Sequence, residues 1–238
     1  MNGMLDNFLY RWRTLTRNQQ LIIGAVVAIL LYGLLSRQDM LSIPRILAAA
    51  AILLIAFPVH EFAHAAMAVY LGDNTPRMQG RLTLDPRAHL DWMGSILIFL
   101  TGFGWARPVE WNPNRVRVPI KQASIMIAVA GPLSNLILAL IGYILAKIIG
   151  YNGFMGAFFD SFAAINVLLA VFNLLPIPPL DGSHVLFALL PGDNSSLQWQ
   201  LRQYGFLILF AVILLLPGLI RGPAMLVDGI LRGMVNLF

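Results

Sequence analysis

The sequence contains no cysteine. A chain without thiols forms no disulfide framework and cannot hold a metal ion through thiolate sulfur. Any metal must therefore be held by His, Asp or Glu. Histidine is itself scarce, with 4 in 238 residues, so a metal site has few candidate ligands.

Charged residues are also scarce. They make up 11% of the chain, against 58% hydrophobic residues, and the mean hydropathy is +0.75. Soluble domains carry about 25% charged residues, and a soluble fold could not cover this much apolar surface. The composition indicates an integral membrane protein. The net charge of +5 fits basic loops that face the cytoplasm, and no basic run interleaved with aromatics suggests nucleic acid binding.

Long apolar stretches predict the membrane topology, because a crossing helix needs about 20 apolar residues. We predict an all-α membrane protein with about five to six transmembrane helices. They lie at residues 21–35, 46–71, 122–146, 151–175 and 203–220, and more weakly at 222–238. The short segment 92–106 contains Gly94, Gly102 and Gly104, which suits a re-entrant or β-hairpin-like element better than a full crossing. The whole chain, 1–238, is predicted to be one polytopic domain: an uncleaved anchor helix in 1–44, a core in 45–190 and C-terminal helices in 191–238.

Basic residues predict the orientation. With the N-terminus in the cytoplasm and 92–106 returning to the side it left, most of the 16 basic residues face the cytoplasm, as the positive-inside rule requires. They are Arg11, Arg13, Arg17, Arg77, Arg81, Arg87, Arg107, Arg115, Arg117, Lys121 and Arg202. Two polar segments on this side, 80–87 and 106–113, are predicted to be short strands or extended loops.

The stretch FPVHEFAHAAMA places His60, Glu61 and His64 inside a predicted span. Residues four apart lie on one face of a helix, so both imidazoles can reach one metal ion. H-E-x-x-H on a helix is typical of metalloproteases, in which the glutamate is the general base. The alternative is a chance match. However, a charged residue at mid-membrane costs roughly 2.5–3.5 kcal/mol and rarely persists without a partner. We therefore predict a metal site, with Zn²⁺ as the best fit.

A third zinc ligand is expected from NLLPIPPLDGSH, where three prolines end a predicted helix just before Asp181. Non-helical backbone at membrane depth is tolerated where it lines a cavity or is buried in protein. The alternative is that Asp181 only caps the next helix. Two histidines remain. His184 could form a further polar wall of the site or lie at the membrane interface, and we favour the interface; we expect His89 to be an ordinary surface residue. In the predicted topology His60, His64 and Asp181 all lie toward the cytoplasmic ends of their helices.

HEFAH followed later by FNLLPIPPLDG resembles the site-2 proteases, the intramembrane zinc metalloproteases. AGPLSN at 130–135 is similar to that family's G-x-x-x-N element, and GRLTLDPRAHLDWMGSI and GFGWARPVEWNP are similar to stretches of its compact prokaryotic members. The resemblance covers about residues 45–190. It implies His60, His64 and Asp181 as zinc ligands and Glu61 as the base. The family's PDZ domain finds no match in the chain, and Ser183 replaces a glycine that many relatives carry.

The resemblance also implies that two asparagines take part in catalysis. Asn173 corresponds to an asparagine that holds the substrate or its oxyanion, and Asn135 belongs to an element linked to substrate handling. An amide donor near the metal could stabilise a tetrahedral intermediate. The alternative for Asn135 is a hydrogen bond between helices that pack closely at a glycine.

The expected function is hydrolysis of peptide bonds within or near transmembrane segments of membrane-protein substrates. One Zn²⁺ ion would activate the water and Glu61 would be the general base. An unwound substrate segment could add as a strand against 80–84 or 106–109. The expected location is the cell membrane of a prokaryote, with the active site toward the cytoplasm. A membrane metal-ion transporter, or a metal-binding membrane protein without proteolytic activity, is the alternative. The sequence does not predict the oligomeric state.

Overall fold

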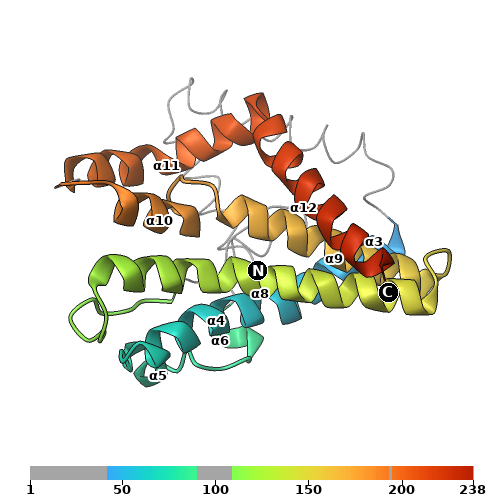
Figure 1. The fold of residues 1–238 in the computed structure, drawn as a ribbon, viewed down its shortest axis with the longest axis horizontal. Coiled ribbons are helices and arrows are strands. Elements are labelled where there is room, and N and C mark those ends of the chain that lie inside the picture. The colour runs from blue at the N-terminus through green and yellow to red at the C-terminus, as the bar shows by residue number, and fades with distance from the viewer. Residues whose placement is uncertain (1–41, 90–108, 193–194, 238) are drawn as a thin grey trace, which may run out of the picture.

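The protein is described by a computed structural model that places residues 42–89, 109–192 and 195–237. Within these ranges it is helical, without a β-strand, as predicted (Figure 1). The helices are α3 (Ile43–Ala51), α4 (Phe57–Tyr70), α5 (Thr75–Met78), α6 (Pro86–His89), α8 (Ile120–Ile149), α9 (Phe154–Asn173), α10 (Asp181–Leu189), α11 (Ser195–Leu215) and α12 (Gly218–Asn236).

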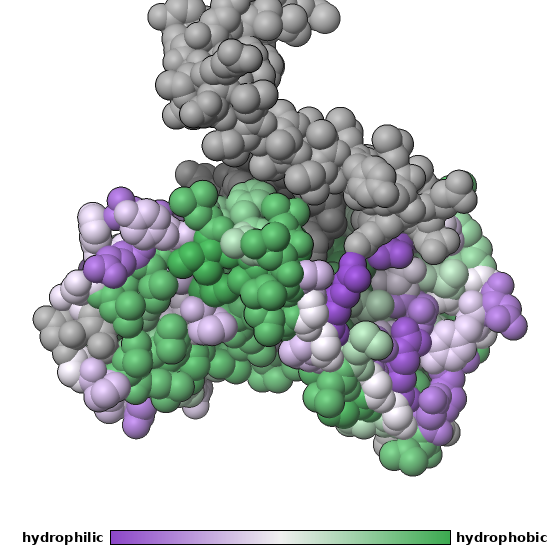
Figure 2. Space-filling view, turned by 90° about the horizontal axis from the view of Figure 1, so that it is seen from above, coloured by the Kyte–Doolittle hydropathy of each residue, from purple (hydrophilic) through white to green (hydrophobic). Residues whose placement is uncertain are grey.

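Four helical stretches are long and apolar enough to cross a membrane: Ile43–Tyr70, Ile120–Ile149, Phe154–Asn173 and Ser195–Leu215. The protein is therefore a multi-pass membrane protein, and four of the predicted spans are found as apolar helices of sufficient length. The predicted span at 21–35 and the hairpin at 92–106 lie outside the described residues. Figure 2 shows a broad hydrophobic area over much of one face, with hydrophilic residues gathered toward the two ends of the view.

The first described span contains one turn of π-helix, Ile52–Ala56, between α3 and α4. There the N–H of Phe57 bonds the carbonyl of Ile52, five residues back. Pro58 follows, and because proline lacks an N–H it cannot continue the regular ladder at this point. The π-turn re-pairs the backbone immediately before the helix that carries His60 and His64.

Helices α8 and α9 form the centre of the molecule and lie side by side (Figure 1). Small residues allow this approach, since a Cβ at Gly142 would lie 2.9 Å from the Cβ of Ala163. Small residues at such contacts are the usual device for packing membrane helices, where no hydrophobic effect drives association. Helix α4 packs on one side of α8, and α10 contacts α8 as well.

Helix α9 ends at Asn173, and a proline-rich turn with a cis Pro178–Pro179 peptide bond leads to α10. Gly182 is needed here, because a Cβ at this position would lie 2.2 Å from the carbonyl oxygen of Leu174. The break in the helix is thus folded tightly back, and the first residue of α10 is Asp181.

The C-terminal helices differ from the prediction in their bounds. The predicted span 203–220 begins at Ser195 and ends at Leu215, and α12 then begins at Gly218. Pro217 explains the break, because proline cannot extend the preceding helix. Helix α12 packs against α8 and α9.

A polar cluster joins α12 to the two central helices. The guanidinium of Arg232 donates to Asp160 of α9 at 2.6 Å and to Asp228 at 2.8 Å. It also lies 4.2 Å from the ring centroid of Tyr143 of α8, whose hydroxyl donates to Asp228. The one charged residue in the predicted span 151–175 is thereby paired.

A strap of residues 109–118 is attached to the end of α4 by Asp73, whose side chain is 0% exposed. Its carboxylate accepts hydrogen bonds from the backbone N–H of Asn112 at 2.6 Å and of Thr75 at 2.9 Å, and from the Thr75 hydroxyl at 2.6 Å. Burial alone raises the pKa of Asp73, but the hydrogen bonds from Thr75 and Asn112 hold the pKa below its ordinary value.

Of the two alternatives predicted for the polar segment 80–87, the strand does not form. Residues 80–85 are a loop, and Pro86 then starts the helical turn α6, with the Asp85 carboxylate accepting from the N–H of Arg87 at 3.0 Å. Residues 109–113 of the second polar segment are likewise not in a strand. The prediction that His89 is an ordinary surface residue was wrong. It is 0% exposed and its Nε2 lies 2.8 Å from the carbonyl oxygen of Thr83, because α6 packs against α4.

Candidate metal centre

His60 and His64 project from one face of α4 toward α8 and α10. Both are buried, at 5% and 6% exposure, and their ring centroids lie 4.6 Å apart. The four-residue spacing on a regular helix accounts for the pairing. Each Nδ1 faces an oxygen of α8: Asn135 Oδ1 at 2.5 Å from His60, and the Ile127 carbonyl at 2.6 Å from His64. The two Nε2 atoms are left facing each other at 3.0 Å.

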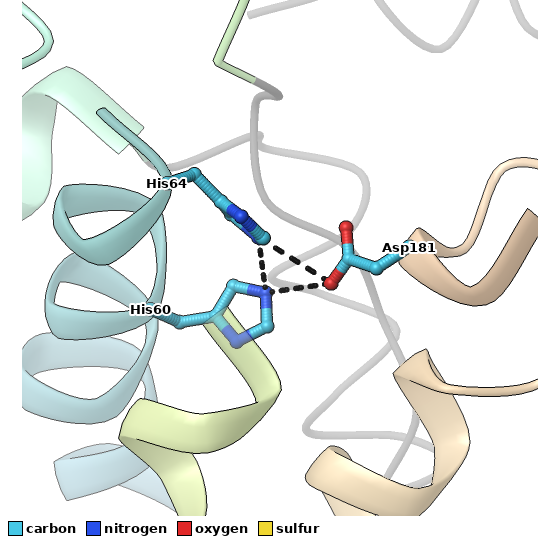
Figure 3. A group of neighbouring side chains, drawn as sticks. All are labelled: His60, His64 and Asp181. Carbon is cyan, nitrogen blue, oxygen red and sulfur yellow. Dashed lines mark hydrogen bonds and ion pairs between the residues drawn. The ribbon is translucent and has the colours of Figure 1, made fainter. Parts of the chain in front are cut away.

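Asp181 completes the group (Figure 3). Its Oδ2 lies 3.2 Å from Nε2 of His60 and 3.3 Å from Nε2 of His64. The helix N-cap is Leu180, and no side-chain cap hydrogen bond forms there. The alternative of Asp181 as a capping residue is therefore not what the structure shows. The carboxylate points across to α4.

The chemistry of these three groups fits a metal ion. The Ile127 carbonyl can only accept a hydrogen bond, so a neutral His64 carries its proton on Nδ1 and a lone pair on Nε2. That lone pair faces a second imidazole nitrogen and a carboxylate oxygen, all within 4.8 Å of one another. Acceptors gathered without a donor repel one another, and a cation removes the conflict. Two imidazoles and one carboxylate are a ligand set typical of catalytic zinc.

A glycine of α8 makes room for the pair of imidazoles. A Cβ at Gly131 would lie 2.3 Å from Nε2 of His64 and 2.6 Å from Nε2 of His60. No side chain larger than hydrogen fits there without displacing both rings. This gives a structural reason for the glycine of the AGPLSN element.

Glu61 lines the same cavity as the three candidate ligands. It is 7% exposed, and its Oε2 has no hydrogen-bond partner among the residues that the structure describes. This cavity has a volume of about 240 Å³. Asn173 at the end of α9 and His184 of α10 line it too, and so do Val109 and Trp111 of the strap. The cavity thus holds, beside the candidate metal position, a carboxylate with one oxygen that no described residue pairs.

Asn135 is placed behind His60. Its Oδ1 faces the ring and its Nδ2 donates to Oδ1 of Asn166 at 2.9 Å. This is the hydrogen bond between helices that the sequence left open as an alternative role for Asn135. Asn166 itself, 0% exposed on α9, was missed at the level of sequence. The signal was present, because an amide inside the apolar run 154–173 must find a partner.

Comparison with known proteins agrees with this geometry. A family model described as Peptidase family M50 matches residues 150–216. The chain is 41% identical over 174 residues to "Putative zinc metalloprotease YwhC" of Bacillus subtilis, a match that covers 69% of this chain and 78% of that protein. The chain belongs to peptidase family M50, the site-2 proteases. The resemblance expected from the motifs is confirmed.

Other M50 relatives are more distant. "Putative zinc metalloprotease Rip2" of Mycolicibacterium smegmatis is 32% identical over 179 residues, which cover 68% of this chain and 64% of that protein. Stage IV sporulation protein FB of Bacillus subtilis is 31% identical over 137 residues, which cover 58% of this chain and 38% of that protein. No solved structure matches the chain. YwhC and Rip2 carry the name "Putative zinc metalloprotease", which favours zinc for the site in this M50 member.

Proposed function

We propose that this protein is an intramembrane zinc metalloprotease that hydrolyses peptide bonds within or near transmembrane segments of membrane-protein substrates. One observation carries the proposal. His60, His64 and Asp181 come from helices far apart in sequence, yet their ligand atoms lie within 4.8 Å of one another. Glu61 lies beside them in the same cavity, with a buried, unpaired oxygen.

In the proposed site His60, His64 and Asp181 hold the zinc ion. Zinc bound there would polarise the substrate carbonyl and lower the pKa of water enough to supply hydroxide near neutral pH. Glu61 accepts a proton from the attacking water on its carboxylate and delivers it to the nitrogen of the leaving amine. The side-chain amide of Asn173, at the wall of the cavity, is the candidate donor to the oxyanion.

The orientation belongs to the same proposal. The loop end of α4 and the start of α8 carry exposed basic residues, among them Arg77, Arg115 and Lys121. The positive-inside rule places this end in the cytoplasm. His64 lies in the C-terminal part of α4, near this end, so water would reach the site from the cytoplasmic side of a prokaryotic cell membrane.

A metal-ion transporter is the second candidate function, because it too would keep ligands inside the membrane. It is not favoured. Transport needs no carboxylate adjacent to the first histidine, and the family relatives are named as proteases.

The proposal is tested with the purified chain and a synthetic transmembrane peptide in detergent micelles or vesicles. We expect cleavage of the peptide that a zinc chelator abolishes and added zinc restores. Zinc uptake into protein-containing vesicles without peptide cleavage would instead identify a transporter. Bound zinc with neither cleavage nor flux would contradict both functions.

A further inference from the structure

Three hydrogen bonds lead from the candidate metal centre into α9. Nδ1 of His60 lies 2.5 Å from Oδ1 of Asn135. Nδ2 of Asn135 donates to Oδ1 of Asn166 at 2.9 Å, and Nδ2 of Asn166 donates to the backbone carbonyl of Phe162 at 2.9 Å. Both asparagines are 0% exposed. Their polar atoms have no access to water, so they depend on one another for partners.

The last acceptor in this series of hydrogen bonds fixes the direction of every bond in it. The Phe162 carbonyl can only accept, so Asn166 must turn its NH₂ group toward it. Oδ1 of Asn166 then faces Asn135, which must donate to it from its own NH₂ group. Asn135 then presents an oxygen to His60. Because an amide oxygen cannot donate, the proton of a neutral His60 is on Nδ1 and the lone pair is on Nε2, toward Asp181.

The two histidines differ in which group fixes their tautomer. The tautomer of His64 is fixed directly by a backbone carbonyl, that of Ile127 at 2.6 Å. The tautomer of His60 is fixed by a side-chain amide, which is chemically able to rotate by 180°. With its NH₂ group toward His60, Asn135 would favour the tautomer that carries the proton on Nε2. A protonated Nε2 cannot bind a metal ion, so something must hold Asn135 in one of its two orientations.

We propose that Asn166 is a positioning residue that fixes the orientation of Asn135 and, through it, the metal-binding tautomer of His60. Outer groups of this kind orient metal ligands and tune their basicity. The inference rests on the metal centre of the proposed function. It does not depend on proteolysis, because metal affinity and tautomer are measured without a substrate.

The test replaces Asn166 by leucine, which has a similar volume and no polar atom. Zinc affinity is measured on the purified full chain by competition with a chromophoric chelator. We expect about tenfold weaker binding, the lower end of the range for outer-shell changes. The ¹⁵N shifts of histidine-labelled, metal-free protein give the second readout. The wild type should show His60 protonated on Nδ1, and Asn166→Leu should show a mixture of both tautomers.

Two further variants separate positioning from packing. Val167→Ala weakens the same helix contact, since Val167 is 1% exposed and packs with Ala139 and Tyr143, but its side chain has no atom that can hydrogen-bond to Asn135 or Asn166. It should leave zinc affinity and tautomer unchanged. Asn166→Asp restores the pattern, because burial keeps the acid protonated and its O–H can donate to Phe162 while its C=O accepts from Asn135. Its zinc affinity should lie within about threefold of the wild type.

The inference is overturned if Asn166→Leu keeps both the wild-type affinity and the single tautomer, or if Val167→Ala causes an equal loss. It is also overturned if Asn166→Asp binds zinc as weakly as Asn166→Leu. A wild-type protein that binds no zinc at all would contradict the proposed function instead. The tautomer of His60 in the metal-free protein would then still decide the role of Asn166.

Discussion

Glu61 and the two histidines share a helix but differ in their surroundings. The histidine Nδ1 atoms are held by α8, whereas Oε2 of Glu61 is buried beside them without a partner in the described part of the chain. Leaving a carboxylate oxygen unpaired costs free energy. The cost is understandable if the oxygen takes up a proton during the reaction.

Replacing Glu61 by glutamine tests this role. Glutamine has almost the same shape but cannot accept the proton, so we expect cleavage of a transmembrane peptide to fall at least 10²-fold. Zinc content should stay at the wild-type level, because Glu61 is not a proposed ligand. Glu110→Gln, an exposed change on the strap, serves as the control and should cleave normally. Cleavage by Glu61→Gln at the wild-type rate would rule out the assigned role.

Gly131 offers a steric test at the residue scale. In Gly131→Ala the new Cβ would lie 2.3 Å from Nε2 of His64, so both imidazoles must shift. Misplacing reacting groups by about 1 Å can cost 10²-fold in rate, and we expect a loss of this order together with reduced zinc content. Gly229→Ala on α12, where a Cβ meets nothing within 4 Å, is the matched control. Full zinc binding by Gly131→Ala would show that the rings can move aside at no cost.

At the scale of elements, α12 is held by apolar packing, which includes the buried Val235, and by a polar cluster around Arg232. Arg232 pairs with Asp160 and Asp228, and these side chains are about a third exposed, at 34%, 31% and 29%. Partial exposure weakens such pairs, yet hydrogen bonds to charged groups still contribute. The cluster lies twelve residues along α8 from Gly131, about 18 Å at the helical rise.

Arg232→Leu should therefore destabilise the protein by roughly 1–3 kcal/mol, measured by denaturant unfolding in detergent. Zinc affinity should remain within about threefold of the wild type, because the cluster is distant from the ligands. Arg221→Leu, an exposed arginine on the same helix, should change stability by less than about 0.5 kcal/mol. Equal effects of the two substitutions would mean that the cluster does not anchor α12.

At the scale of the whole molecule, the proposed orientation can be tested because the chain has no cysteine of its own. Asn114 precedes α8 and Asn152 follows it, and both are exposed. In intact cells a membrane-impermeant maleimide should label Asn152→Cys. It should label Asn114→Cys only after the membrane is opened. The reverse pattern would place the metal centre toward the opposite compartment.

The sequence was most informative where polar side chains stand inside apolar, membrane-spanning runs. His60, Glu61, His64 and Asp181 were identifiable because polar groups inside apolar runs are costly. Asn166 stands in the same kind of run but belongs to no motif, and only its contact with Asn135 gives it a role. His89 was misjudged for the opposite reason. A polar segment usually lies at the surface, and only the packing of α6 against α4 buries this residue.

By itself the sequence determined the membrane character, four of the crossing helices and the types of group that could bind a metal ion. These follow from local properties: apolar length, four-residue spacing and the helix-breaking prolines before Asp181. Only the tertiary structure decided that Asp181 reaches both histidines, that Gly131 leaves room for them and that Asn166 stands behind Asn135. Such contacts depend on how α4, α8, α9 and α10 pack, and packing depends on side chains far apart along the chain.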